Sequence, residues 1–446
     1  MIDRHVVRVV EPGIADTDAH ALGHGIRFNY EALQSYCWRR LDEVDIDLLV
    51  VASGVALADR QITRHRSKQW ARDICVELPV HDVAPWEQAE EQLRDCLEWL
   101  TGDRWSFRWV RRRSKDERAL QLYLPDHGEA PQSVVSYSGG LDSYSEATVR
   151  IHNESLPPLL VTTKNQGVGN VPVPAGYGGS SVWLPVKIRS GNHAEPTYRT
   201  RQFVFFAAAA LACRLRGASR VVIPEPGQGS IGPSVIPFNE HPYRATHPAF
   251  TRRLQRLLAE VWGSAPTFDH PSLWRTKAQL LRAATRRAPS DGWVDTRSCS
   301  RDVGRHKGLP KGPGTRHCGI CGGCLLRRFS LSAAGLADQE QYFWHDLSGP
   351  ELKSHSDFGG GYTTDTDRQV ATYAVLDNTH LAGAALVTDN DGDFRVAAAQ
   401  LADALELDPS ETASRLRQLL GQHRQEWNAF VDELPKTSWV RQLVDV

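Results

Sequence analysis

The chain has 446 residues, with 52 Lys and Arg against 53 Asp and Glu, so its formal net charge is −1. This length allows two or three domains, and the composition, with 41% hydrophobic and 24% charged residues, is typical of a soluble globular protein. The near-zero charge excludes a general attraction to nucleic acid or anionic membranes, and no apolar run approaches the roughly 20 residues of a membrane span. The first residues lack the apolar core of a signal peptide, and we expect a cytoplasmic protein.

Residues 1–128 contain no recognisable catalytic motif, and we predict that they form an N-terminal α+β domain. The stretch Trp86–Thr101 carries apolar residues at helical spacing and acidic residues on its other face, which predicts an amphipathic helix. Five short runs enriched in β-branched and aromatic residues predict strands. These runs are His5–Val10, Ile26–Tyr30, Asp47–Ala52, Ile74–Val80 and Trp105–Arg111.

The stretch Ser133–Ser145 predicts a buried strand, a glycine-rich turn and a helix in direct succession. Two adjacent glycines allow a sharp turn with inward-pointing N–H groups, and the helix start adds further donors and a partial positive charge. We therefore predict a phosphate-binding loop, in which a Mg²⁺ ion separates the carboxylate of Asp142 from the phosphates. The loop residues are Ser138, Gly139, Gly140, Leu141, Asp142 and Ser143.

Beyond this loop the predicted strands and helices alternate, which favours a parallel sheet with crossover helices and a ligand site at the carboxyl ends of its strands. Arg201, near the start of a predicted helix, is either an anion contact or a surface residue. Gly227–Gly232 matches G-x-G-x-x-G, but flanking prolines forbid the helix of a dinucleotide site, and we interpret it as a substrate-facing loop or an ordinary turn. The alternating elements are Leu159–Thr163, Val182–Ile188, Tyr198–Gly217 and Arg220–Ile223.

Four of the eight cysteines fall within a short region of the sequence. Cys318, Cys321 and Cys324 have the C-x-x-C-x-x-C spacing with which three thiolates can bind one ion, and Cys299 is the candidate fourth ligand. A closed set of four cysteines predicts a structural Zn²⁺ ion, because no coordination position is left for water. His317 as the fourth ligand and an iron–sulfur cluster are the alternatives.

The remaining sequence contains loops and helices without a further catalytic motif. The basic, glycine-rich loop Arg301–Arg316 is either a lid over an anionic substrate or a segment without function. Asp389–Asp393 resembles a calcium-binding loop, but its glycine is misplaced and the bidentate glutamate is missing, so we interpret it as a turn. From about Ala333 onward we predict a largely helical region. Its helices are Gln369–Val387, Val396–Leu405 and Pro409–Leu420.

The motif Ser138–Ser143 resembles the SGGxDS signature of the PP-loop ATP pyrophosphatase family, whose members cleave ATP to AMP and pyrophosphate while they adenylate a substrate. The order of Cys299, the cysteine triplet and Arg327 is similar to that of QueC-like proteins, the 7-cyano-7-deazaguanine synthase-like members of this family. The resemblance covers about residues 130–345. It implies an α/β fold whose parallel-sheet PP-loop core carries a zinc-binding segment.

The resemblance also implies which residues take part in catalysis. Thr276 and Lys277 resemble a Thr-Lys pair of QueC-like sequences, so Lys277 is either a group that neutralises phosphate charge or a solvated helix residue. Arg201 is implied to lie near the nucleotide, and with Asp142 these residues are the catalytic candidates. The expected organisation is an N-terminal α+β domain (1–128), a QueC-like PP-loop ATPase domain with a Cys₄ zinc site (129–332) and a helical C-terminal region (333–446).

The activity implied by the resemblance uses ATP to adenylate a 7-deazaguanine carboxylate or amide, which is then transferred to an amine. With ammonia the product is 7-cyano-7-deazaguanine, and with a protein amine it is a modified partner. The added terminal regions resemble QueC-like proteins of bacterial anti-phage operons, such as QatC and the type IV CBASS member, which favours a partner protein. A tRNA-modifying PP-loop enzyme and a non-catalytic, zinc-stabilised scaffold are the alternatives. The near-zero net charge counts against the first, and the intact loop counts against the second.

Overall fold

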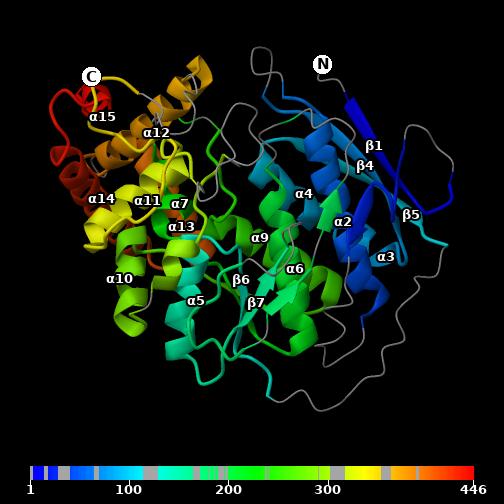
Figure 1. The fold of residues 1–446 in the computed structure, drawn as a ribbon. Coiled ribbons are helices and arrows are strands. Elements are labelled where there is room, and N and C mark those ends of the chain that lie inside the picture. The colour runs from blue at the N-terminus through cyan, green and yellow to red at the C-terminus, as the bar shows by residue number, and fades with distance from the viewer. Residues whose placement is uncertain are drawn as a thin grey trace.

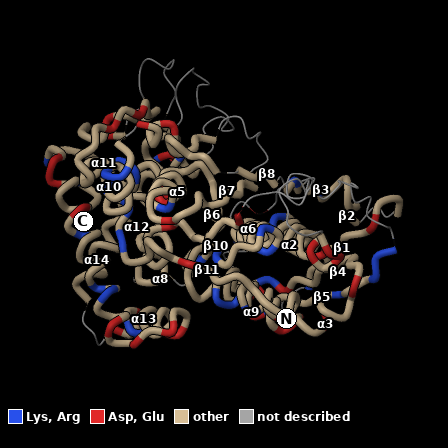
Figure 2. Tube along the Cα trace, turned by 90° about the horizontal axis from the view of Figure 1, so that it is seen from below, with Lys and Arg blue, Asp and Glu red and all other residues tan. Residues whose placement is uncertain are grey.

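The computed structural model describes residues 4–14, 19–28, 41–64, 70–113, 129–163, 171–179, 181–184, 186–188, 195, 199–236, 239, 241–289, 291–301, 317–352, 363–387 and 391–445. These residues form two parallel sheets and a group of C-terminal helices (Figure 1), so the prediction of a mixed α/β protein is confirmed. Basic and acidic residues are mixed over all three parts (Figure 2). Every helix within the described residues is too short or too polar to cross a membrane.

The first sheet belongs to the N-terminal part, and all its strands run parallel in the order β2-β1-β4-β5. The predicted α+β class is therefore corrected to α/β for this part. The predicted strand Asp47–Ala52 is wrong, because these residues lie inside helix α2 (Glu43–Gln61), whose apolar run is buried on all sides. Periodicity alone cannot distinguish such a run from a buried strand. The other elements are β1 (Arg4–Val10), β2 (Ala19–Ala21), β4 (Asp73–Val80), α3 (Ala84–Gln88), α4 (Glu90–Thr101) and β5 (Arg104–Arg111).

The second sheet is also parallel and has the order β11-β10-β6-β7-β8. The chain proceeds from β6 outward to β8 and then returns to β10 on the other side of β6. This reversal is a topological switch point at the carboxyl ends of β6 and β10, which is where parallel sheets of this kind usually bind ligands. The predicted strand Val182–Ile188 is split, because β9 (Val186–Ile188) pairs antiparallel with β3 (Ile26–Phe28) of the N-terminal part. The sheet strands are β6 (Ser133–Ser136), β7 (Leu159–Thr162), β8 (Ser181–Trp183), β10 (Arg220–Val222) and β11 (Thr267–Asp269).

Helix α6 (Arg201–Arg216) packs between α2 and the second sheet and joins both sheets into one hydrophobic core. Its four consecutive alanines, Ala207–Ala210, are fully buried, which allows a close approach to the strands. Val134 of β6 faces this core, whereas Val135 faces the other side and packs with α5 (Leu141–Asn153), because successive strand residues point to opposite faces. The second sheet is therefore covered by α6 on one face and by α5 on the other.

Buried ion pairs fix the N-terminal part against the start of α6. Asp59, at the end of α2, accepts hydrogen bonds from the backbone N–H groups of Arg199 and Thr200 at 2.6 and 2.9 Å. The same carboxylate pairs with Arg72, which also pairs with Asp103 next to β5. Buried charges are stable only with such partners, so these contacts restrict how α6 can lie on the first sheet. Residues 114–128 lie outside the described residues, and the domain boundary near residue 128 stays a prediction.

The C-terminal region is helical, and α14 (Pro409–Asp432) continues well past the predicted end at Leu420. Gly227–Gly232 does not begin the long helix of a dinucleotide-binding site, as the flanking prolines predict. The segment instead forms two single-turn helices. Pro226 lies just before the first of these helices, and Pro233 lies in the first turn of the second, and at both places no backbone N–H is needed. The remaining helices are α7 (Gly227–Ser230), α8 (Gly232–Val235), α9 (Pro248–Trp262), α10 (Lys277–Arg287), α11 (Gly322–Ala334), α12 (Asp365–Ala384), α13 (Gly392–Leu405) and α15 (Trp439–Val444).

Candidate functional site

The predicted phosphate loop lies at the switch point, between the end of β6 and the start of α5. Gly139 has a φ of +67°, in the left-handed region that favours glycine. A Cβ on Gly139 would lie 2.5 Å from Cγ1 of Val171, and a Cβ on Gly140 would lie 3.0 Å from the carbonyl oxygen of Arg297. The turn therefore favours glycine at position 139, and close packing against two other segments leaves little room for a side chain at either position.

Two serine hydroxyls hold the loop in shape. Ser143 Oγ accepts a hydrogen bond from the Ser138 N–H at 3.3 Å and donates one to the Gly140 carbonyl at 3.0 Å. The Gly140 N–H donates to Ser138 Oγ at 3.2 Å. Helix α5 begins at the next residue, so the N–H groups of its first turn and the positive end of its dipole lie at this loop. A preformed turn of this kind can bind an anion such as phosphate.

The structure brings two of the predicted catalytic residues together. Asp142 lies in the first turn of α5, and Lys277 is the first residue of α10. Lys277 Nζ and Asp142 Oδ2 form an ion pair whose side chains are only 6% and 18% exposed. Lys277 is therefore not a solvated helix residue, whereas its part in catalysis stays a prediction. Asp142 Oδ1 is buried and has no hydrogen-bond partner within the described part of the chain.

The third catalytic candidate, Arg201, is placed differently. Its side chain is exposed at the start of α6, and its guanidinium lies 5.2 Å from the ring centroid of Phe205. Among the described residues the structure gives it no hydrogen bond or ion pair, and thus no link to the pair formed by Asp142 and Lys277. The interpretation as a surface residue fits this position, and a role at the nucleotide stays a prediction.

Glu225 follows β10 and was missed by the sequence interpretation. The register pairs Val222 of β10 with Val135 of β6, so Glu225 lies at the same sheet edge as the phosphate loop. Its carboxylate packs against Gly229, where a Cβ would lie 2.0 Å from Oε1. An acidic residue directly after a strand of a parallel sheet, in Pro224-Glu225-Pro226, was the available sequence signal.

Glu225 also differs electrostatically from an ordinary glutamate. Burial of its carboxyl group and the nearby charge of Asp142 raise the pKa of Glu225 to about 7, while the ammonium of Lys277 opposes this shift. A carboxyl group with such a pKa can accept or donate a proton near neutral pH. The site therefore combines the predicted phosphate loop, a buried cation and a carboxyl group suited to proton transfer.

The four predicted metal ligands lie together at the start of α11. The Sγ atoms of Cys299, Cys318, Cys321 and Cys324 all lie within 4.8 Å of one another, so they could hold one metal ion such as zinc. Backbone N–H groups point at the sulfur atoms, since the Cys318 N–H lies 3.4 Å from Cys299 Sγ and the Cys321 N–H lies 3.4 Å from Cys318 Sγ. Such donors favour thiolates, which is the form that binds a metal.

His317 does not face the cysteine cluster. Its Nε2 accepts a hydrogen bond from the Ser298 N–H at 2.8 Å, and its Nδ1 lies 2.8 Å from Glu340 Oε2. Both ring nitrogens are therefore engaged, which removes the alternative of His317 as the fourth ligand. Arg327 is fully buried and donates to Thr296 Oγ1 at 2.9 Å, so it fixes α11 to the segment that precedes Cys299.

The cysteine segment also contacts the phosphate loop. The backbone N–H of Arg297, two residues before Cys299, donates to the carbonyl of Gly139 at 3.2 Å. A metal ion held by Cys299 would therefore restrain this support of the loop. The predicted lid, residues Arg301–Arg316, lies outside the described residues except for Arg301, which pairs with Asp367 of α12 at 2.8 Å.

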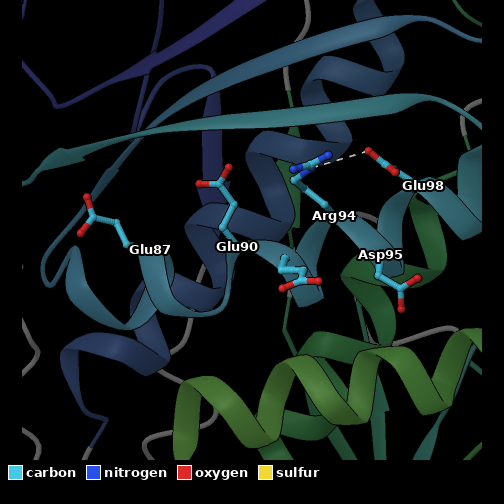
Figure 3. A pocket seen from close by; sticks show the side chains of 6 residues that line it. Glu87, Glu90, Arg94, Asp95 and Glu98 are labelled. Carbon is cyan, nitrogen blue, oxygen red and sulfur yellow. Dashed lines mark ion pairs between the residues drawn. The ribbon is translucent and has the colours of Figure 1, made fainter.

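An open hollow of about 490 Å³ lies along α3 and α4 of the N-terminal part (Figure 3). It contains none of the predicted site residues. Five acidic side chains and Arg94 line it, and Arg94 is 3.7 Å from Glu98 in the pair drawn there. Acidic residues on the outer face of an amphipathic helix are normally solvated, which is how the sequence interpretation placed them. The hollow gives no indication of catalysis.

The chain is similar to the 7-cyano-7-deazaguanine synthase of Paracoccus denitrificans (strain Pd 1222), with 26% identity over 240 residues. The match covers 95% of that protein and 48% of this chain. No protein-family model matches the chain, and no solved structure matches it. The similarity supports a relationship with the QueC-like family, in agreement with the loop and the cysteine cluster. A large part of this chain has no counterpart in that relative.

We expect the purified protein to contain one zinc ion per chain, measured by elemental analysis. Cys318→Ser or Cys324→Ser should lower the zinc content at least severalfold and lower the melting temperature, because a closed Cys₄ site contributes directly to folding. Cys213→Ser is the matched control, since Cys213 is buried in α6 outside the cluster. Iron in place of zinc, or full zinc content in both ligand variants, would contradict the assignment.

Proposed function

We propose that this protein is an ATP-dependent QueC-like enzyme that adenylates a 7-deazaguanine carboxylate or amide and transfers it to an amine. The observation that carries the proposal is the buried pair of Lys277 and Asp142 directly beside the Ser138–Ser143 loop, at the switch point of a parallel sheet. The similarity to a 7-cyano-7-deazaguanine synthase supports the substrate class. The anion-binding loop supports ATP as the second substrate.

In the first proposed step, the N–H groups of the loop and of the first turn of α5 bind the phosphates of ATP. A carboxylate oxygen of the deazaguanine attacks the α-phosphorus, the bond to the bridging oxygen breaks, and pyrophosphate leaves with the electron pair. Lys277 neutralises the negative charge on the phosphoryl oxygens. A preorganised cation of this kind is effective because it is fixed before the reaction and shielded from water.

Magnesium is proposed to enter with ATP and to bind next to Asp142. Lys277 already neutralises Oδ2 of Asp142, and the partnerless Oδ1 is the kind of oxygen ligand that Mg²⁺ prefers. When bound, the ion would shield the phosphates from the carboxylate. Asp142 then connects the loop, the lysine and the metal–nucleotide complex.

In the second proposed step, the amine nitrogen attacks the carbonyl carbon of the adenylate, and AMP leaves with the electron pair of the broken C–O bond. The nitrogen must lose a proton, and Glu225 accepts it. Its position at the same edge of the sheet and its pKa of about 7 suit this role. The product is an amide of the 7-deazaguanine.

The acceptor is proposed to be an amine of a partner protein from the same operon, in bacterial anti-phage defence. The support is that a large part of the chain has no counterpart in the 7-cyano-7-deazaguanine synthase that it resembles. Ammonia is the competing acceptor. It would give the primary amide, and a second adenylation on the amide oxygen followed by loss of AMP would give the nitrile.

The first step is tested by pyrophosphate–ATP exchange in the presence of 7-carboxy-7-deazaguanine and Mg²⁺. We expect exchange by the wild-type protein and a fall in rate of roughly 10²–10³-fold in Lys277→Gln, the size of effect typical for a preorganised electrostatic group. Asp142→Asn should be similarly impaired. Glu91→Gln, on the exposed face of α4, should exchange normally. No exchange with any deazaguanine would favour the non-catalytic scaffold.

The second step should depend on the charge of Glu225, with hydroxylamine as the acceptor and hydroxamate as the measured product. Burial and the nearby charge of Asp142 raise the pKa of Glu225 to about 7, against the opposing effect of Lys277, so Glu225 is protonated at low pH and inactive as a base. The rate should therefore rise about tenfold per pH unit below pH ~7 and level off above it. In Glu225→Gln the rate should be low and flat, while exchange persists. A wild-type pH profile in Glu225→Gln would exclude this role.

The acceptor can be identified by incubating the protein with ATP, 7-carboxy-7-deazaguanine and lysate of cells that express its own operon. We expect intact-mass spectrometry to find a protein that carries a deazaguanine adduct, and no adduct with Asp142→Asn. Accumulation of free 7-cyano-7-deazaguanine with ammonia, and no protein adduct, would instead identify ammonia as the acceptor.

A further inference from the structure

Helix α14 comes from the C-terminal region, yet it contacts the first turn of α10, where Lys277 lies. One face of α14 carries His423 and Glu426, which are buried with exposures of 0% and 4%. Buried polar side chains need hydrogen-bond partners. The partner of His423 is Gln228, which also binds the backbone N–H of Lys277, and the partner of Glu426 is Thr276, the residue before Lys277.

The first connection runs through Gln228 of α7. Its Oε1 accepts a hydrogen bond from the backbone N–H of Lys277 at 2.7 Å, and its Nε2 lies 2.7 Å from Nδ1 of His423. His423 Nε2 lies 3.0 Å from the carbonyl oxygen of Asn378, which can only accept, so Nε2 carries the ring proton and Nδ1 accepts from Gln228. Burial lowers the pKa of His423 to about 4, so the ring is neutral near pH 7, as this network requires.

The second connection runs through Thr276, the N-cap residue of α10. Its Oγ1 donates to Glu426 Oε1 at 2.8 Å and accepts from the Gln279 N–H at 3.2 Å. Glu426 Oε1 also accepts from Gln422 Nε2 at 2.9 Å, within α14. The cap that starts α10 is thereby fixed to the C-terminal helix as well as to its own turn.

These contacts matter because Lys277 is in an unfavourable place. A cation at the N-terminus of a helix is repelled by the helix dipole, and a buried ammonium loses its hydration. It stays against Asp142 only if the first turn of α10 is held in position. The backbone N–H of Lys277 and the side chain of Thr276 are the two groups through which α14 provides this restraint.

We propose that His423 and Glu426 are positioning residues that hold the Lys277 ammonium against Asp142, so that the C-terminal region forms part of the active site. The proposal rests on the catalytic role of Lys277 given above. It assigns to α14 a function in the reaction, although this helix is far from the Ser138–Ser143 loop in the sequence. Loss of the connection through Gln228 or of the connection through Thr276 should shift the Lys277 ammonium away from Asp142, while the lysine itself stays in the chain.

The test compares three variants of the full-length protein in pyrophosphate exchange. His423→Phe keeps the ring volume but removes both hydrogen bonds, and Glu426→Leu removes the acceptor for Thr276. We expect kcat to fall roughly ten- to a hundredfold in both, with KM for ATP changed less than about threefold, because a small displacement of a catalytic group acts mainly on the transition state. Glu426→Gln keeps an acceptor oxygen for Thr276, so this variant should retain most of the wild-type kcat.

A second readout needs neither ATP nor deazaguanine. Trace labelling with acetic anhydride, followed by mass spectrometry, measures the reactivity of Lys277 relative to the exposed Lys436 of the same chain. Lys277 should react slowly in the wild type, because it is buried and paired. We expect its relative labelling to rise roughly tenfold in His423→Phe and Glu426→Leu. This experiment remains informative if the wild type shows no exchange, so failure of the proposed function and failure of this inference can be told apart.

Two controls separate positioning from stability. Gln425→Ala changes the exposed face of α14, and Leu416→Ala removes a buried apolar contact of the same helix. Leu416→Ala should lower the melting temperature but leave kcat and Lys277 labelling as in the wild type. The proposal is overturned if His423→Phe and Glu426→Leu lower only the melting temperature, or if Leu416→Ala reduces kcat as strongly as they do.

Discussion

The ion pair between Lys277 and Asp142 is the interaction on which the arrangement of the site depends. Both residues occupy the first turn of a helix, so their pairing brings the N-termini of α5 and α10 together at the switch point. The ammonium would be costly to bury alone, and a carboxylate alone would repel phosphates next to the Ser138–Ser143 loop. Together they place a fixed ammonium group beside the Ser138–Ser143 turn, with the charge of the Asp142 carboxylate balanced.

The cysteine cluster supports the same loop from another side. Arg297 lies two residues before Cys299 and donates a backbone hydrogen bond to Gly139. Arg327 lies one turn beyond Cys324 on α11. It donates a hydrogen bond to Thr296 and so holds the segment before Cys299. A metal ion held by all four cysteines would have no position for water, and it would restrain two chain segments next to the loop.

The terminal regions are built into the central sheet rather than attached to it. Asp59 of the N-terminal part accepts the first N–H groups of α6, and one hydrophobic core extends over both sheets. In the C-terminal region, His423 and Glu426 reach the first turn of α10. Residues of both terminal regions therefore help to hold the elements that carry the central site.

The sequence by itself determined the features that depend on local spacing: the glycine turn at Ser138–Ser143, the C-x-x-C-x-x-C cluster and the alternation of strands with helices. It failed at Asp47–Ala52, because an apolar run buried on all sides carries no periodicity. Only the tertiary structure decided that Asp142, Glu225 and Lys277 lie near one another at one edge of the sheet, because strand order and register bring together residues that are distant in the chain. It also decided that His317 turns away from the cysteines, since that depends on Ser298, which donates a hydrogen bond to Nε2, and on Glu340, whose carboxylate lies 2.8 Å from Nδ1.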